Sequence, residues 1–235
     1  MKRLQLDYVD VIFAHRPDYR VPLEEQVRAF SWLIDNGLAW YWGTSEWSAL
    51  MFEEACQIAE KLHLHAPVVE QCQYNMFVRE RFEKEHKPLF ERRGMGTTIW
   101  SPLAGGFLAG KYNDGNIPEG SRGEMMTKSG GLLASIPNRY FGAENKEKTI
   151  KLLTTVAEIA KDIGCTQAQL ALAWSIAHHD CSTALLGFSR VSQIDENLKA
   201  IDVLEKWTPE LEKRINDALG NTPNMELNWR TWSQE

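Results

Sequence analysis

A short apolar run followed by a helical pattern recurs along the first half of this chain. The runs YVDVIFA, LAWYWG, PVVEQC and GTTIW begin at residues 8, 38, 67 and 96, so that one unit repeats about every 30 residues. Helical patterns lie between them at 22–37, 48–62 and 78–94, and a fifth apolar run follows at 182–187. Strands that alternate with helices pair in parallel, which predicts an α/β fold with roughly five parallel strands and helical crossovers.

The second half of the chain is less regular. Residues 101–140 are Gly-rich and show no clear periodicity, so we expect a long loop there. Helices are expected at 146–163, from 167 to 178 behind the capping box Thr166-Gln-Ala-Gln169, at 191–203, and after Thr208-Pro209. The tail NWRTWSQE is expected to be irregular. Two architectures fit these units, an open doubly wound sheet and a (β/α)₈ barrel, and five strands alone cannot close the barrel.

Composition excludes several classes of function. The net charge is −6, with 43% hydrophobic and 25% charged residues, and an acidic chain without a basic stripe is a poor nucleic-acid ligand. No apolar run approaches the roughly 18 residues of a membrane span, and the N-terminus has no signal-peptide core. The four cysteines form no C-x-x-C pair, so we expect free thiols, a cytoplasmic location and no direct membrane insertion. No histidine spacing indicates a metal site.

Polar residues follow the predicted strands, at the edge where both candidate architectures hold their sites. His15 follows the first strand, Ser45 the second, Gln71 ends the third, and Ser101 follows the fourth. His15 in VDVIFAHRPD suggests proton chemistry, although a histidine considered alone is more often structural.

Two glycine-containing stretches are candidates for phosphate binding. GGFLAGKY (105–112) lacks the Ser or Thr of a P-loop and opens no helix, which excludes an NTPase. In LLGFSRVSQIDEN, a strand ends at Gly187 and a helix follows Arg190, which fits either a phosphate site or a plain strand-to-helix turn.

The motifs DYVDVIFAHRPD, YWGTSEWS, VVEQCQYNMF, WSPLAGGFLAGKY and LLGFSRVSQIDEN, in this order, resemble the aldo-keto reductase superfamily. The resemblance is greatest to the branch that contains the β subunits of voltage-gated potassium channels. It implies a partial (β/α)₈ barrel over residues 1–235 as one domain, matching the family's strands four to eight and lacking its first three βα units. The expected cofactor is NADPH.

The resemblance assigns roles residue by residue. His15 matches the catalytic histidine, whereas no residues match the family's catalytic Asp, Tyr and Lys, so the chain is expected to be an N-terminally truncated, catalytically impaired fragment. Residues around the nicotinamide, the pyrophosphate and the adenosine end of the cofactor are, in chain order, Ser45, Gln71, Trp100, Ser101, Pro102, Leu103, Ala104, Gly105, Lys111, Arg122, Gly187, Ser189, Arg190, Gln193, Glu196 and Asn197. Arg190 is placed for a 2′-phosphate. Glu46 and Gly120 depart from the branch pattern, which has Arg and Tyr there.

Three functional hypotheses follow. The first is a reductase of aldehydes or ketones, impaired in this chain. The second is a regulatory module that forms a homo-tetramer or docks on the cytoplasmic domain of an ion channel. The third is a shortened gene model or splice form without a function of its own.

Overall fold

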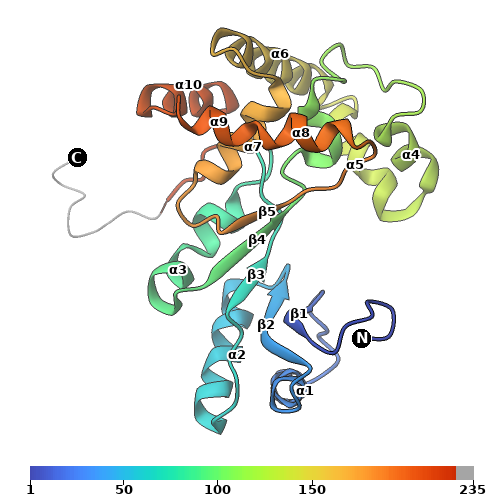
Figure 1. The fold of residues 1–235 in the computed structure, drawn as a ribbon. Coiled ribbons are helices and arrows are strands. Elements are labelled where there is room, and N and C mark those ends of the chain that lie inside the picture. The colour runs from blue at the N-terminus through green and yellow to red at the C-terminus, as the bar shows by residue number, and fades with distance from the viewer. Residues whose placement is uncertain (226–235) are drawn as a thin grey trace, which may run out of the picture. The chain divides into compact units, whose positions relative to one another are not determined.

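The computed structural model describes residues 1–225, apart from the side chains of residues 131–133. The described chain forms two compact units. Among the described residues, unit 1 comprises 1–68, 79–95 and 221–225, and unit 2 comprises 69–78 and 96–220. Figure 1 shows the elements of both units.

Unit 1 holds two parallel strands and the helices around them. Its elements are β1 (Val9–Ala14), α1 (Leu23–Asp35), β2 (Ala39–Ser45), α2 (Ala49–Leu62), the π-helical turn η1 (Arg81–Glu85) and α3 (Lys87–Arg93). The strands pair in parallel with Val11 opposite Tyr41 and Ala14 opposite Thr44. Helix α1 is the crossover between them, as the repeat predicts.

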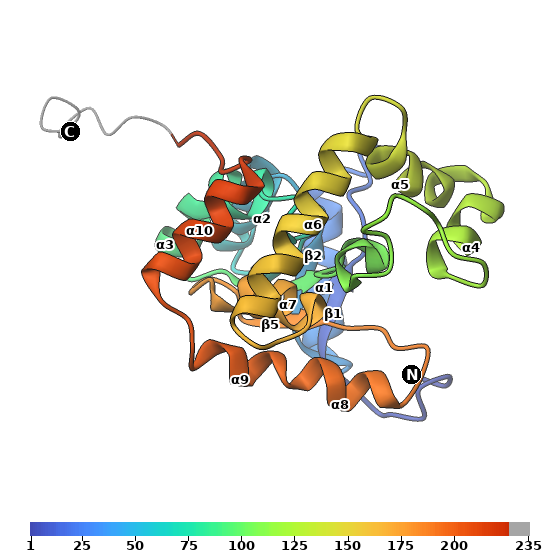
Figure 2. The same ribbon diagram turned by 90° about the horizontal axis from the view of Figure 1, so that it is seen from above.

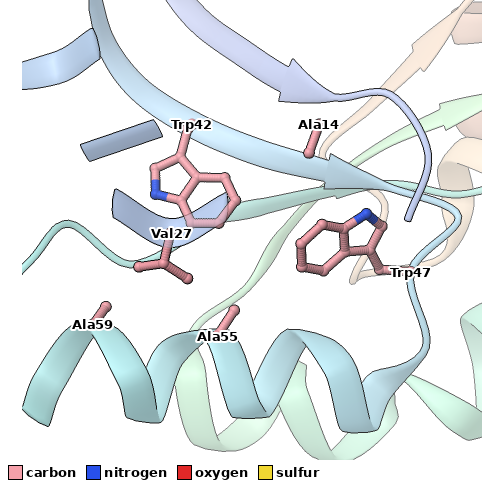
Figure 3. Packing of buried hydrophobic residues seen from close by; sticks show 6 residues of the cluster. All are labelled: Ala14, Val27, Trp42, Trp47, Ala55 and Ala59. Atoms are coloured by element: carbon pink, nitrogen blue, oxygen red, sulfur yellow. The ribbon is translucent and has the colours of Figure 1, made fainter. Parts of the chain in front are cut away.

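The core of unit 1 lies between its strands and helices. Trp42 and Trp47 are fully buried, and Figure 3 shows Trp42 beside Val27 and above Ala55 and Ala59 of α2. The indole Nε1 of Trp42 donates to the carbonyl oxygen of His65 at 2.8 Å, so that burial leaves no unpaired donor on this side chain. Ser48 caps α2, because its hydroxyl accepts from the amide of Met51 at 3.2 Å.

Unit 2 holds three parallel strands and most of the helices. Its elements are β3 (Val69–Gln71), β4 (Gly96–Trp100), the 3₁₀ segment η2 (Ala104–Ala109), α4 (Arg122–Ser129), α5 (Gly131–Phe141), α6 (Lys146–Asp162), α7 (Gln167–Ala177), β5 (Thr183–Leu185), α8 (Ser192–Leu198), α9 (Ala200–Leu204) and α10 (Pro209–Leu219). β4 pairs in parallel with both β3 and β5. Figure 2 shows α4 and α5 together at the end of unit 2 away from α10.

The predicted fold class is confirmed: the fold is α/β, with parallel strands and helical crossovers as in part of a (β/α)₈ barrel. The capping box at the start of α7 is confirmed as well, because Thr166 and Gln169 exchange both hydrogen bonds. None of the helices between residues 1 and 225 combines the length and apolar character that crossing a membrane requires.

Three expectations about local structure were wrong. Residues 101–140 are not one loop, since η2, α4 and α5 lie within them. The helix expected at 78–94 is interrupted at His86, and the one expected at 191–203 is interrupted at Lys199. The tail 228–235 lies outside the described residues.

Candidate functional site

The candidate site residues divide between the two units. His15 and Ser45 belong to unit 1, and all the others belong to unit 2.

In unit 1 the strand register brings His15 and Ser45 to the same edge. Ala14 is opposite Thr44, so the next residues, His15 and Ser45, leave the two strands side by side. His15 is exposed, whereas Ser45 is fully buried. A catalytic role for His15 stays a prediction, and its exposed position leaves the ring accessible to a substrate.

Arg16 is a site residue that the sequence did not single out. Its Nη1 donates to the Ser45 hydroxyl at 2.8 Å and to the carbonyl oxygen of His15 at 2.5 Å. One guanidinium therefore connects the two strand ends and fills one acceptor position of the serine hydroxyl. The sequence feature that could have drawn attention to Arg16 is its position directly after His15 in HRPD.

Glu46, which departs from the branch pattern, is held by Arg81. The Nη1 of Arg81 donates to the Glu46 carboxylate at 2.6 Å and to its carbonyl oxygen at 3.1 Å. Glu46 also has a φ of 60°, which is uncommon for a residue other than glycine. The negative charge beside Ser45 is thus compensated within unit 1.

In unit 2 the Ser101–Gly106 loop follows β4 and has an unusual backbone. Ser101 and Ala104 have φ values of 56° and 50°, and Gly105 and Gly106 have φ values of 70° and 101°. Left-handed backbone at non-glycine residues costs about 1–3 kcal/mol each and gathers at functional sites.

Three backbone amides of the Ser101–Gly106 loop donate hydrogen bonds to acceptors within the loop. The amide of Ala104 donates to the Ser101 carbonyl at 2.9 Å, and that of Gly105 donates to the Ser101 hydroxyl at 3.0 Å. The amide of Gly106 donates to the Leu103 carbonyl at 2.8 Å. These three amides are used inside the loop, so the loop's main contribution to a ligand is its fixed shape.

Asn75, which follows β3, holds the Ser101–Gly106 loop in place. It is fully buried. Its Nδ2 donates to the Ser101 carbonyl at 2.9 Å, and its Oδ1 accepts from the amides of Phe77 and Val78 at 3.0 and 3.1 Å. One side chain therefore satisfies three backbone groups of two adjacent loops.

The same loop packs against α4. A Cβ on Gly105 would lie 3.1 Å from the Cε of Met126, which belongs to α4. Arg122 is the first residue of α4, so the structure brings a predicted phosphate-binding cation to the helix that contacts the loop. Arg122 and Lys111 are both exposed. Residues 111–121 form turns and bends instead of a helix, as expected for a sequence that is not a P-loop.

The second loop of unit 2 runs from Gly187 to Gln193. The Oε1 of Gln193 accepts from the Ser189 amide at 2.9 Å, the Ser189 hydroxyl at 3.2 Å and the Arg190 amide at 3.1 Å. The amides of Ser189 and Arg190, which precede this helix, are thus engaged by a side chain of the same segment. α8 itself has seven residues, too few turns for a substantial dipole.

Gly187 has no steric reason to be glycine within the described fold. Its backbone is not left-handed, and a Cβ placed on it would meet nothing within 4 Å. Arg190 and Glu196 are exposed, and Asn197 is partly buried. The carbonyl oxygen of Glu196 accepts from the Nε2 of Gln169 at 2.7 Å, which connects α8 to the start of α7.

Two buried tyrosines of unit 2, Tyr112 and Tyr140, belong to the packing around η2. Tyr140 packs against Phe107 and Phe77, and burial raises its pKa to about 12. Tyr112 is buried, and its hydroxyl accepts from the Gly123 amide at 3.1 Å. Both side chains are part of the packing around η2.

The cysteines are free, as predicted, and two of the four are fully enclosed. Cys56 and Cys72 are buried, whereas Cys165 and Cys181 are partly exposed. Burial raises the pKa of Cys56 and of Cys181 to about 11. Neither thiol forms a reactive thiolate at neutral pH.

Comparison with known proteins identifies the family. Residues 1–217 match the model of the aldo/keto reductase family. This chain belongs to that family.

Its relatives include proteins named for potassium channels. A protein of Schizosaccharomyces pombe described as a putative voltage-gated potassium channel subunit beta is 49% identical over 230 residues, which is 98% of this chain and 64% of that relative. Proteins of Oryza sativa subsp. japonica and Arabidopsis thaliana, each described as a probable voltage-gated potassium channel subunit beta, are 42% identical over 230 residues, or 98% of this chain and 67% of theirs. The predicted superfamily and branch are confirmed, and the chain spans about two thirds of the length of these relatives.

Proposed function

We propose that this chain forms the cofactor-binding part of an NADPH-dependent reductase of aldehydes or ketones. The observation that carries the proposal is the Gly187–Gln193 segment of unit 2. Glycine stands there in open space with an ordinary backbone, and one reason for such a glycine is the close approach of a ligand to the main chain.

Arg190 and Gln193 give this segment its chemistry. Gln193 fixes the backbone of Ser189 and Arg190 with three hydrogen bonds, which lowers the entropy lost when a ligand binds. Arg190 is exposed, and a guanidinium is suited to a phosphate because its donors form a planar fork. A 2′-phosphate is the group that distinguishes NADPH from NADH, so Arg190 would set the preference for NADPH.

The Ser101–Gly106 loop, with Arg122 on the adjacent α4, supplies a second place for phosphate. Its shape is fixed before binding by Asn75 and by its own hydrogen bonds. Ser101 accepts from Gly105 through its hydroxyl oxygen, which leaves the hydroxyl proton as a donor to a ligand. Gln71, which ends β3, is the proposed contact of unit 2 for the nicotinamide amide.

His15 is proposed to orient and polarise the substrate carbonyl, with Arg16 holding the strand end on which it stands. Bound NADPH would supply the hydride. This chain contains no match for the family's Asp, Tyr and Lys, and general acid catalysis contributes roughly 10²–10⁴-fold to rate. We therefore propose that the chain by itself binds NADPH without turning over carbonyl substrates.

The free thiols are compatible with a reducing cytoplasm.

The test is a titration of the whole chain with NADPH and with NADH, followed by cofactor fluorescence. We expect saturable binding with NADPH preferred, and Arg190→Gln should weaken NADPH binding about tenfold while leaving NADH unchanged. The matched control is Arg20→Gln, because Arg20 is a highly exposed arginine of unit 1. Equal affinity for both nucleotides in the unmodified chain would contradict the proposal.

A regulatory role is the second candidate, and the 42–49% identity to proteins described as potassium channel β subunits favours it. In that case the chain would assemble as a homo-tetramer and dock on the cytoplasmic domain of an ion channel. Solution mass and a pull-down with a purified channel cytoplasmic domain separate the two. A monomer that the channel domain does not retain would eliminate the regulatory role.

A further inference from the structure

The loop between α7 and β5 brings together two imidazoles and a carboxylate. The Nε2 of His179 lies 3.1 Å from the Oδ2 of Asp180, and the Nδ1 of His178 lies 3.8 Å from the same oxygen. All three donor atoms lie within 4.8 Å of one another. Two histidines and an aspartate form a donor set typical of Zn²⁺, unlike a cluster of carboxylates alone.

The distances fit a single metal ion. Zinc bonds of about 2.0 Å at tetrahedral angles place neighbouring donor atoms about 3.3 Å apart, which lies between the two distances measured to Asp180. The Nδ1 of His178 is unprotonated, since it accepts from the amide of Asp180 at 3.3 Å, and a bound ion would take the place of this long hydrogen bond. The ring of His179 is stacked on that of His178, and its high exposure lets it turn to bring its nitrogen to the ion.

The backbone of this loop is fixed by β4. The Thr97 hydroxyl donates to the Asp180 carbonyl at 2.6 Å and accepts from the Ser182 amide at 3.1 Å, and the Thr97 amide donates to the Ser182 hydroxyl at 3.1 Å. A metal ion would therefore meet a chelating loop whose main chain is already ordered, which reduces the entropy lost on binding. The loop precedes β5, at the opposite end of that strand from Gly187.

We propose that His178, His179 and Asp180 form a Zn²⁺ site at the amino end of β5, separate from the proposed cofactor segment. Three protein ligands leave one position for water. The bound ion would tie the end of α7, where His178 is the cap residue, to the start of β5.

The test is a titration of the metal-free whole chain with Zn²⁺, read by competition with a chromogenic chelator. We expect one equivalent to bind. His179→Ala and Asp180→Asn should each weaken binding by more than about tenfold, because even changes around metal ligands cost 10- to 100-fold. His179 is a suitable position because its side chain is 85% exposed, so its removal leaves the packing unchanged.

Two control variants exclude other zinc ligands. Cys181→Ser removes the adjacent thiol, and His63→Asn removes an exposed histidine whose left-handed backbone asparagine tolerates. Both should bind Zn²⁺ as the unmodified chain does. Binding that survives His179→Ala and Asp180→Asn, binding that is lost in Cys181→Ser, or the lack of a saturable equivalent would each overturn the proposal. None of these variants alters the cofactor segment, so the result is independent of the proposed function.

Discussion

The two loops proposed to hold the cofactor in unit 2 are built in opposite ways. The Ser101–Gly106 loop has a left-handed backbone, internal hydrogen bonds and a buried asparagine behind it. The Gly187–Gln193 loop has an ordinary backbone at Gly187, open space around that glycine and one glutamine that organises it. The first loop is therefore an integral part of the folded structure, whereas the second is a surface segment.

Because of this difference, substitutions in the two loops should have different effects on stability and on cofactor binding. Substitutions in the first loop should lower the free energy of unfolding, because they expose strained or buried groups. Substitutions in the second should mainly change cofactor affinity, because little of the fold depends on that segment.

Asn75→Ala should destabilise the chain most, by about 3 kcal/mol, because a buried side chain loses three hydrogen bonds to part-buried backbone groups, each worth about 1 kcal/mol. Urea unfolding measures the change. Asn116→Ala is the matched control, since Asn116 is exposed and bonds only to Asp114 among the contacts described, and should cost less than about 0.5 kcal/mol. Similar losses in the two variants would refute the role of Asn75.

Gly105→Ala should cost about 1–2 kcal/mol, because alanine at a φ of 70° is strained, and Met126 must also move. Gly37→Ala has nearly the same φ, 66°, with no neighbour within 4 Å of the added methyl. The difference between the two variants in thermal unfolding therefore isolates the contact with α4. If Gly37→Ala proves the more damaging, the packing of α4 on this loop is not as described.

Gln193→Ala should cost less than about 1 kcal/mol in stability, because the hydrogen bonds that it removes lie at an exposed segment. It should nevertheless weaken NADPH binding about tenfold, because the loop must then be ordered on binding. Gln57→Ala, which removes an exposed glutamine of α2 bonded to Glu53, is the control. An unchanged NADPH affinity would show that Gln193 does not preorganise the site.

Gly187→Ala should leave stability unchanged or raise it by about 0.4–1 kcal/mol, because a methyl fits the open space and stiffens the unfolded chain. The same methyl should obstruct a ligand that approaches the main chain and so lower the affinity for NADPH. Calorimetric titration beside thermal unfolding measures both. If Gly187→Ala lowered stability and left the affinity for NADPH unaltered, Gly187 would serve the fold and not the binding of the cofactor.

Much of the fold could be predicted from the sequence because its signals are local. The strand and helix repeat, the cap at Ser48 and the capping box at Thr166 each depend on residues within one turn of each other. Helices α4 and α5 escaped prediction because Pro137 and adjacent glycines hide their periodicity. The break at His86 was missed because the residues on either side continue a helical pattern.

The places of the candidate residues at strand ends were predictable from the sequence, whereas the contacts that these residues make were not. His15 and Gly187 stand at strand ends, which the repeat locates. The contact of Arg16 with Ser45 joins residues that are 29 positions apart, and no local pattern indicates it. The cluster at His178 was missed because adjacent residues usually point in different directions and converge only where a loop turns.

Hydrogen exchange of the whole chain with and without NADPH tests the contrast between the two loops most directly. The amides of Ala104, Gly105 and Gly106 should exchange slowly in the absence of cofactor and change little when it is added, because all three are already bonded. The amides of residues 187–193 should exchange faster at first, because the hydrogen bonds of Ser189 and Arg190 to Gln193 lie at an exposed segment, and their exchange should slow on addition of NADPH. Protection that appears at Ala104–Gly106 and not at 187–193 would contradict the account.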